Sequence, residues 1–288
     1  MALIPVLLMV LSASLAATKN ILVKGLTGFS MKNREFFGVQ AVIFAVGSAV
    51  LLIINAFDFN GVSLSTFLCG LAYGVILIGA QWFYTLALMQ GKTAVCATLY
   101  SFGFVVPTLS GMIFWNERVS VFGIIGILIV FPVLIISGKG KKGEGNGSKK
   151  YIFYLIIALL CSGGVGIVQK VHQKTEFAQQ KNAMVLIAFM LGFFVSSVFY
   201  LFMKSGETRI YRRHLGVCAG VGSLYAVCNC LNTFLAGALP SAIFFPVLNI
   251  LSIVTSMMLG LIVYRERLTR KDILVLALGA VAIVFVNL

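Results

Sequence analysis

Uncharged polar side chains form faces inside the apolar stretches of this 288-residue chain. Residues three, four or seven positions apart lie on the same side of an α-helix. This spacing predicts four polar faces: Gln81 with Tyr84, Ser101 with Thr108, Tyr225 with Asn229 and Asn232, and Asn249 with Ser252 and Ser256. A polar side chain buried in lipid needs a partner, so hydrogen bonding between helices explains any one face. Four faces together favour a polar cavity.

Two lysines and two amides lie near the ends of apolar segments. Lys19 and Asn20 fall near the end of segment 3–23, and Gln169 and Lys170 end segment 151–170. Such a lysine can extend its ammonium to the membrane surface, or it can anchor an anionic or zwitterionic ligand. Asn20 and Gln169 hold equivalent positions, and we expect them at the two mouths of the cavity. The predicted cavity residues are Lys19, Asn20, Gln81, Tyr84, Ser101, Gln169, Tyr225, Asn229, Asn232, Asn249 and Ser252.

No acidic residue occupies the middle of an apolar segment. The eight acids fall in loops or at segment ends: Glu35, Asp58, Glu117, Glu144, Glu176, Glu207, Glu266 and Asp272. A proton relay through the membrane normally needs an ionisable group in the bilayer core. The six cysteines lie inside apolar segments without a CxxC pair or a His-Cys cluster. We therefore expect no catalytic residues, no metal site and no cofactor.

The sequence around Glu117-Arg118 recurs 149 residues later around Glu266-Arg267. With only eight acids in the chain, a repeated Glu-Arg pair is unlikely to be a coincidence of composition. The two glutamates could be functional acids, but their position in tight turns beside an arginine favours local pairing and turn formation. The repeat indicates a duplicated unit, and substrate sites in such proteins usually lie where the two halves meet.

Ten apolar segments are long enough to cross a bilayer, which takes about 20 residues. Their continuous apolar character predicts helices rather than barrel strands. They cover residues 3–23, 35–56, 65–88, 93–115, 120–138, 151–170, 183–203, 214–237, 241–264 and 270–288. Ser-Leu-Ala-Ala at 14–17 resembles a signal-peptide cleavage site, but no basic residue precedes Lys19, and the segment has a counterpart in the second half. We expect it to be a retained helix.

Small residues and prolines mark predicted helix contacts. Gly70 with Gly74, and Gly216 with Gly220, have the spacing that brings helices close together in lipid. Pro107 and Pro246 lie inside apolar segments and predict either kinks that line the cavity or ordinary helix curvature.

A basic, glycine-rich linker at 139–150 separates the repeats, residues 1–138 and 151–288. Because each repeat has five segments, the second must enter the membrane the opposite way up. If both termini face away from the cytoplasm, all 22 basic residues except Arg118, Lys170, Lys174 and Lys181 fall in cytoplasmic loops. Membrane topology therefore explains the net charge of +14, and we expect no nucleic-acid partner. The predicted fold class is an all-α membrane protein with ten transmembrane helices as two inverted five-helix repeats.

The ten-segment duplication, the Glu-Arg pair after the fourth and ninth segments and the first segment ending near Lys19 resemble the drug/metabolite transporter superfamily, in particular its EamA-type members. The resemblance covers the whole chain. It implies a basket of helices around a cavity lined by segments one, three, four, six, eight and nine. Members move amino acids, nucleosides, sugars, phosphorylated sugars and drugs, many of them outward. One departure is that Ser12-Ala13-Ser14-Leu15 replaces the aromatic residues common in the first segment.

The sequence thus predicts a secondary transporter or facilitator for a small polar metabolite, with export of an amino acid or related zwitterion as the leading hypothesis. A carrier for sugars or nucleotide-like anions is the alternative. An intramembrane lipid-modifying enzyme is a remote alternative, because it would need clustered acids, histidines or a metal site. We expect a multi-pass protein of a bacterial-type plasma membrane, present as a monomer or homodimer, whose partners are the lipid bilayer and a small-molecule substrate.

Overall fold

The described elements of this computed structural model are all helices. The structure describes residues 3–27, 33–55, 61–90, 96, 99–100, 102–117, 120–122, 124–126, 128–129, 149–203, 212–264 and 270–287, and no strand occurs among them. The helices are α1 (Leu3–Thr27), α2 (Asn33–Asn55), α3 (Leu64–Gln90), η1 (Phe102–Phe104), α5 (Val105–Trp115), α7 (Lys149–Gln173), η2 (Ala178–Gln180), α8 (Lys181–Phe202), α9 (Arg212–Ala238), α10 (Ser241–Tyr264) and α11 (Arg270–Asn287). The prediction of an all-α fold is confirmed.

Five of these helices are long and apolar enough to cross a membrane. They cover Arg34–Asn55, Leu64–Gln90, Lys150–Gln173, Ala178–Phe202 and His214–Ala238. Shorter apolar helices cover Leu7–Val23 and Phe102–Trp115. Large apolar side chains such as Phe114 and Phe202 point outward, with exposed fractions of 73% and 82%. A helical bundle with an apolar exterior is what a bilayer requires, so the chain is a membrane-embedded protein.

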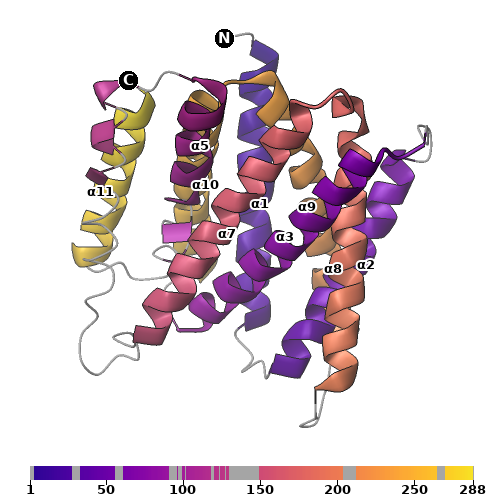
Figure 1. The fold of residues 1–288 in the computed structure, drawn as a ribbon. Helices are drawn as coiled ribbons and strands as arrows, with labels where there is room; N and C mark the ends of the chain where they lie inside the picture. Colours follow the sequence, from indigo (N-terminus) through magenta and orange to yellow (C-terminus); the bar gives the residue numbers. More distant parts are fainter. Residues whose placement is uncertain are drawn as a thin grey trace.

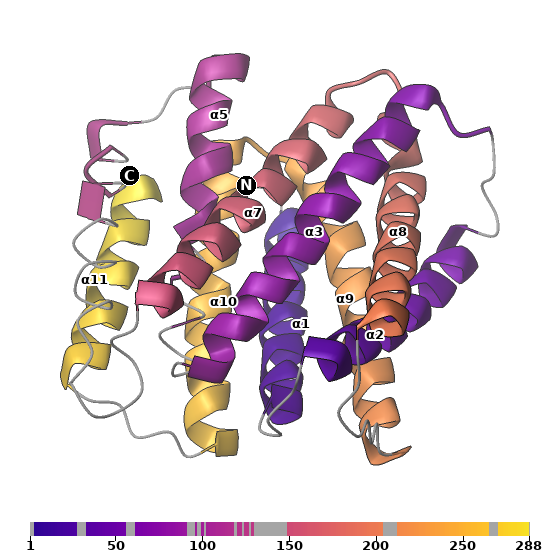
Figure 2. The ribbon, with the colours of Figure 1, turned by 60° about the horizontal axis from the view of Figure 1, so that its bottom comes forward.

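The helices of each half pack mainly against helices of the other half. In the first half, α1 contacts α9 and α10, and α2 contacts α8 and α9. In the second half, α7 contacts α3, η1 and α5. Figure 1 shows α3 and α7 crossing in the middle of the bundle, with α8 beside α2 at one side. In Figure 2, α11 lies at one edge beyond α10, the helix that it contacts most.

The first helices of the two halves run in opposite directions. Ser12 and Lys19 of α1 meet Asn232 and Tyr225 of α9 respectively, so α1 and α9 are antiparallel. In α3, Thr66 meets His172 and Tyr73 meets Gln169, so α3 and α7 are antiparallel. Tyr73 and Gln81 of α3 also meet Asn229 and Tyr225 of α9, which makes α3 parallel to α1. It follows that α7 is antiparallel to α1, as Figure 1 shows, and both termini lie on one side of the bundle.

Glycines allow close contacts at two helix crossings. A Cβ atom at Gly70 would lie 2.8 Å from Cβ of Ile187 on α8, and one at Gly74 would lie 3.0 Å from the Ala188 carbonyl oxygen. The first predicted small-residue pair is therefore a helix contact. The prediction for Gly216 and Gly220 is wrong, because a Cβ atom at either position would meet nothing closer than 3.9 Å. On α9 it is Gly222, two residues after Gly220, that contacts the backbone of α2 at Ile43.

The predicted end of the linker differs in the structure. α7 begins at Lys149, so the last two residues of the predicted linker belong to a helix. The rest of that linker, together with Arg118, Glu266 and Arg267, lies outside the described residues.

Candidate functional site

A cavity of about 140 Å³ lies between helices of both halves. Its lining comes from α1, α3, η1, α5, α7, α9 and α10, with Tyr100 just before η1. These elements belong to the predicted segments one, three, four, six, eight and nine. Among the predicted site residues, the following line the cavity: Lys19, Asn20, Gln169, Tyr225, Asn229, Asn232, Asn249 and Ser252. Asn20 and Gln169 thus share one cavity, and their positions at its two mouths stay a prediction.

Gln81 and Tyr84 do not line the cavity, contrary to the prediction. Both are on the face of α3 that also carries Leu77, the lining residue that α3 contributes. Gln81 hydrogen-bonds to Tyr225, and the Tyr84 ring lies 4.4 Å from the ring of Tyr100. The predicted face is therefore oriented toward the cavity, but the Tyr225 ring covers Gln81 and the Tyr100 ring covers Tyr84. Ser101 lies outside the described residues.

Lys19 is a buried cation at this cavity. Its exposed fraction is 7%, and α1 continues for eight residues beyond it to Thr27. Its Nζ atom lies 4.4 Å from the centroid of the Tyr225 ring, which is a cation–π contact. The alternative that Lys19 extends to the membrane surface does not fit this position. Among the residues that the structure describes, no carboxylate forms an ion pair with Lys19.

Asn229 of α9 and Gln169 of α7 join helices as well as line the cavity. Asn229 Oδ1 accepts a hydrogen bond of 2.5 Å from the Tyr73 hydroxyl, and its Nδ2 donates to the Tyr225 carbonyl at 2.7 Å. Gln169 Nε2 donates to the Tyr73 oxygen at 3.0 Å and to Thr233 Oγ1 at 3.1 Å. This network links α3, α7 and α9. Each of these amides therefore both hydrogen-bonds to a neighbouring helix and lines the cavity, as the two hypotheses from the sequence proposed separately.

Asn232 makes the corresponding contact with α1. Ser12 Oγ donates to Asn232 Oδ1 at 2.6 Å and lies 3.4 Å from Cys228 Sγ. Ser12 lies where the resemblance leads one to expect aromatic residues, and a phenylalanine ring could not donate this bond. The departure noted in the first segment therefore coincides with a direct polar contact between α1 and α9.

Asn249 shows how α10 presents polar groups to the cavity. Its Nδ2 donates to the Phe245 carbonyl at 2.6 Å, one turn earlier, beside Pro246. Ser252 lies one turn later on the same face. A proline inside a helix leaves the carbonyl four residues earlier, here that of Ala242, without its usual donor, and such a group is tolerated in a membrane only against protein or water. Pro107, in the first turn of α5, lines the cavity directly.

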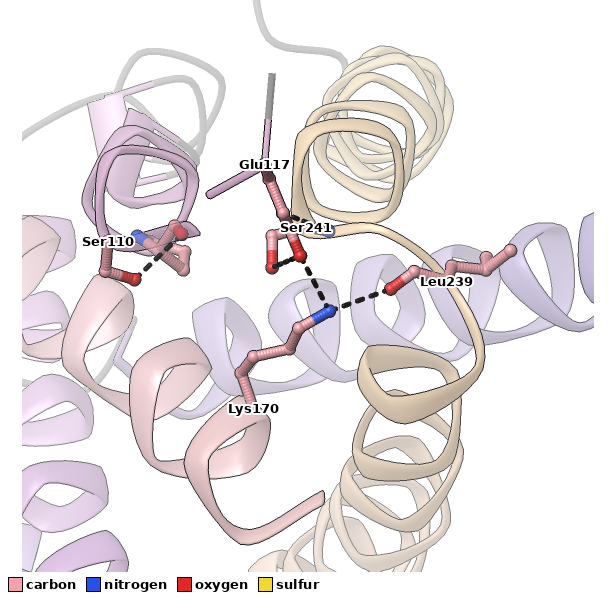
Figure 3. A network of polar contacts seen from close by, with 6 residues as sticks. Ser110, Glu117, Lys170, Leu239 and Ser241 are labelled. Atoms are coloured by element: carbon pink, nitrogen blue, oxygen red, sulfur yellow. Dashed lines mark hydrogen bonds and ion pairs between the residues drawn. The ribbon is translucent and has the colours of Figure 1, made fainter. Parts of the chain in front are cut away.

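Lys170 lies next to a cavity residue but is bound to protein groups. Its Nζ lies 3.1 Å from Glu117 Oε1 and donates to the Leu239 carbonyl at 3.1 Å. Glu117 Oε2 accepts a 2.9 Å hydrogen bond from the Ser241 backbone N–H (Figure 3). The carboxylate thus meets the first N–H of α10, and the ammonium meets a carbonyl just past the end of α9. Each charge has the sign that the helix dipole favours.

A left-handed turn places Glu117 in this position. α5 ends at Trp115, and Asn116 has φ 52° and ψ 30°, a conformation that asparagine adopts more readily than most residues. The backbone N–H of Glu117 then bonds to the Gly111 carbonyl at 3.1 Å. Glu117 does occupy a tight turn, as predicted, but its described partners lie in α7 and at the start of α10. For Lys170, this pairing replaces both the membrane-surface role and the ligand-anchoring role considered from the sequence.

The cavity also contains residues that the sequence analysis did not select. Ser162 and Gly166 lie seven and three residues before Gln169, so the helical spacing places all three on one face. The rings of Tyr100, Phe104, Phe244 and Phe245 form its apolar walls. No spacing rule singles out these aromatic residues, because the chain contains 24 phenylalanines and 9 tyrosines. Among the described residues, no group of His, Cys, Asp and Glu could hold a metal ion.

Comparison with known proteins identifies the fold alone. No protein-family model matches the chain, and no curated protein matches it. Among solved structures, the chain is similar to a crystal structure described only as that of a protein, with a TM-score of 0.63 and 17% identity. The similarity covers 95% of this chain and 96% of the other, so the helical arrangement is shared over nearly the full length of both proteins.

Proposed function

We propose that this protein is a secondary transporter or facilitator that moves a small polar metabolite by alternating access around the described cavity. The observation that carries the proposal is the position of that cavity. Asn20 of α1 and Gln169 of α7, which are equivalent in the sequence repeat, both line it. A site to which repeat-equivalent residues contribute lies between the repeats, which is where transporters of this architecture bind their substrates.

The proposal includes ten transmembrane helices in two inverted repeats. Two features of the helix packing support this arrangement. Exchanging the halves converts the contacts of α1 with α9 and α10 into the contacts of α7 with α3 and α5. The antiparallel directions of α1 and α7 are those that an inverted repeat requires. We further propose a multi-pass protein of the cell membrane, with both termini outside and the 139–150 linker in the cytoplasm.

The proposed substrate is an amino acid or a related zwitterion, and export is the proposed direction. A carrier for sugars or nucleotide-like anions is the second candidate, favoured by the amides and hydroxyls at the cavity. The described lining contains one basic residue, Lys19, and no acidic residue. A lipophilic cation would need a buried anion there, since an unpaired charge at the centre of a span costs about 2.5–3.5 kcal/mol. We therefore propose that cations are poor substrates and that transport does not use a proton-carrying carboxylate.

Transport assays in proteoliposomes test the proposal. Amino acids should exchange across the membrane without an imposed pH gradient, and quaternary ammonium compounds should not be transported. Empty liposomes and protein-containing liposomes without internal substrate are the controls. Uptake of the ammonium compounds that requires a pH gradient and disappears on Glu117→Gln or Glu266→Gln would refute this mechanism.

A further inference from the structure

We infer that Lys19 binds the carboxylate of a small monoanionic substrate, and that the ammonium group of an amino acid contributes little to its recognition. This inference rests on the proposed function and narrows it to a chemical class. It starts from the position of the lysine: Lys19 is 7% exposed, lines the cavity and lies above the Tyr225 ring. An aromatic ring stabilises a cation but does not neutralise it.

Charge balance at the cavity requires an anion. A buried ammonium without a counter-ion is unfavourable, because burial removes its hydration. The other buried lysine near the cavity, Lys170, already has Glu117 as its counter-ion. Lys19 has none among the described residues, and a bound carboxylate would neutralise its charge.

A single charge favours a monoanion over a phosphate ester. A phosphate monoester carries about −1.5 to −2 charges at neutral pH, whereas the described lining offers only the one positive charge of Lys19. Nucleotides and sugar phosphates would therefore bring an excess of negative charge into a buried site. A carboxylate brings one charge, and Lys19 can donate charge-assisted hydrogen bonds to it.

The cavity offers little to the ammonium of a zwitterion. No Asp or Glu occurs in the described lining. Two amide oxygens at the cavity already accept short hydrogen bonds, Asn229 Oδ1 from Tyr73 and Asn232 Oδ1 from Ser12. An added ammonium would lose its hydration without gaining an anionic partner. Lactate and alanine both have a carboxylate on a three-carbon skeleton, but lactate has a hydroxyl where alanine has the ammonium. We therefore expect lactate to bind at least as well as alanine.

The volume sets an approximate size limit. The cavity measures about 140 Å³, and a protein cavity of about 150 Å³ is known to hold benzene, which has six non-hydrogen atoms. Lactate and alanine also have six. Tyr100, Phe104, Phe244 and Phe245 provide apolar walls for the carbon skeleton of such a substrate.

Binding of a matched ligand series to the purified full-length protein tests the inference. The probes are propionate, lactate, alanine, propionamide and ethylamine, measured by calorimetry and by ligand-induced shifts of the melting temperature. Propionate and lactate should bind, alanine should bind no more tightly than lactate, and propionamide and ethylamine should bind at least tenfold more weakly. Binding of propionamide equal to that of propionate, or binding of alanine tenfold tighter than that of lactate, would overturn the inference, as would no binding by any probe.

Two lysine variants separate the charge from the rest of the site. Lys19→Met should weaken lactate binding by a factor of about ten to one hundred, the range expected for loss of a hydrogen bond to a charged group. Lys19→Arg should retain most of the binding. Lys181→Met is the matched control, because Lys181 also lies near an aromatic ring, 5.8 Å from the Phe234 centroid, but does not line the cavity. Equal lactate binding by wild type and Lys19→Met would contradict the assignment.

The inference and the proposed function fail in different ways. Lactate binding that depends on Lys19, without flux through proteoliposomes, would support the carboxylate site and refute transport. Flux of amino acids that is unchanged in Lys19→Met would support transport and refute the carboxylate site.

Discussion

Lys19 and Lys170 are both buried lysines on the first helix of a half of the chain, but only Lys170 has a carboxylate beside it. Lys170 lies 3.1 Å from Glu117 Oε1 and also donates to the Leu239 carbonyl. Lys19 faces the cavity and the Tyr225 ring. Burial alone therefore does not separate a structural lysine from a ligand-binding one. The difference lies in whether the protein itself supplies the counter-ion.

The two environments have different energetic consequences. Removing one member of a buried ion pair leaves the other charge uncompensated, which costs about 3–5 kcal/mol. Removing a buried charge that has no partner eliminates a desolvation penalty and can leave stability unchanged or increased. The comparison therefore predicts that substitution by methionine lowers stability at Lys170 and leaves it nearly unchanged at Lys19.

Lys170→Met should cause the largest loss of stability. It leaves the Glu117 carboxylate, whose side chain is only 16% exposed, beside the start of α10 without its cation. We expect a loss of about 3–5 kcal/mol, measured as reversible unfolding of the detergent-solubilised protein. Lys170→Met combined with Glu117→Gln should recover part of the loss, and the coupling energy from this double-mutant cycle isolates the pair. Additive effects of the two substitutions would show that the pair is not a unit.

Lys19→Met should change function rather than stability. We expect the free energy of unfolding to change by less than about 1 kcal/mol, because no ion pair is broken. The rate of substrate exchange at low substrate concentration should fall by a factor of about ten or more. Unfolding and exchange are measured on the same preparation, with Lys181→Met as the control that should change neither. A loss of stability as large as that of Lys170→Met would mean that Lys19 has a structural partner.

Asn229→Leu should have a smaller effect on stability than Lys170→Met and a clear effect on transport. Hydrogen bonds between membrane helices contribute about 0.6 kcal/mol each on average, and Asn229 bonds to Tyr73 on α3. We therefore expect a decrease in stability of about 1 kcal/mol and loss of transport by the folded protein. Asn249→Leu is the comparison, because the Asn249 amide donates within α10, so it should reduce transport with less change in stability. Full transport activity per folded molecule in both variants would show that these amides stabilise the helices and are not needed for transport.

The sequence predicted the helical class and two of the four polar faces as cavity lining, those of α9 and α10, because both follow from local periodicity. It could not predict whether the residues of each face reach the cavity or are covered by side chains of other helices. Gln81 and Tyr84 share the face of Leu77, but the Tyr225 ring, from the other half of the chain, covers Gln81, and the Tyr100 ring, from the next segment, covers Tyr84. The same limit applied to Lys170, whose partner Glu117 lies 53 positions away and depends on the left-handed turn at Asn116. Side-chain spacing indicates which residues share a helix face, whereas charge pairing between helices depends on how they pack.

Exchange of lactate across proteoliposomes containing wild-type or Lys19→Met protein tests the central claim most directly. Liposomes loaded with unlabelled lactate should take up labelled lactate through the wild-type protein without a pH gradient, and uptake should fall by a factor of about ten or more in Lys19→Met. The Lys181→Met protein should match wild type. Equal uptake by wild-type and Lys19→Met liposomes would contradict the role of Lys19, and uptake by wild type no greater than that of protein-free liposomes would contradict lactate transport through this cavity.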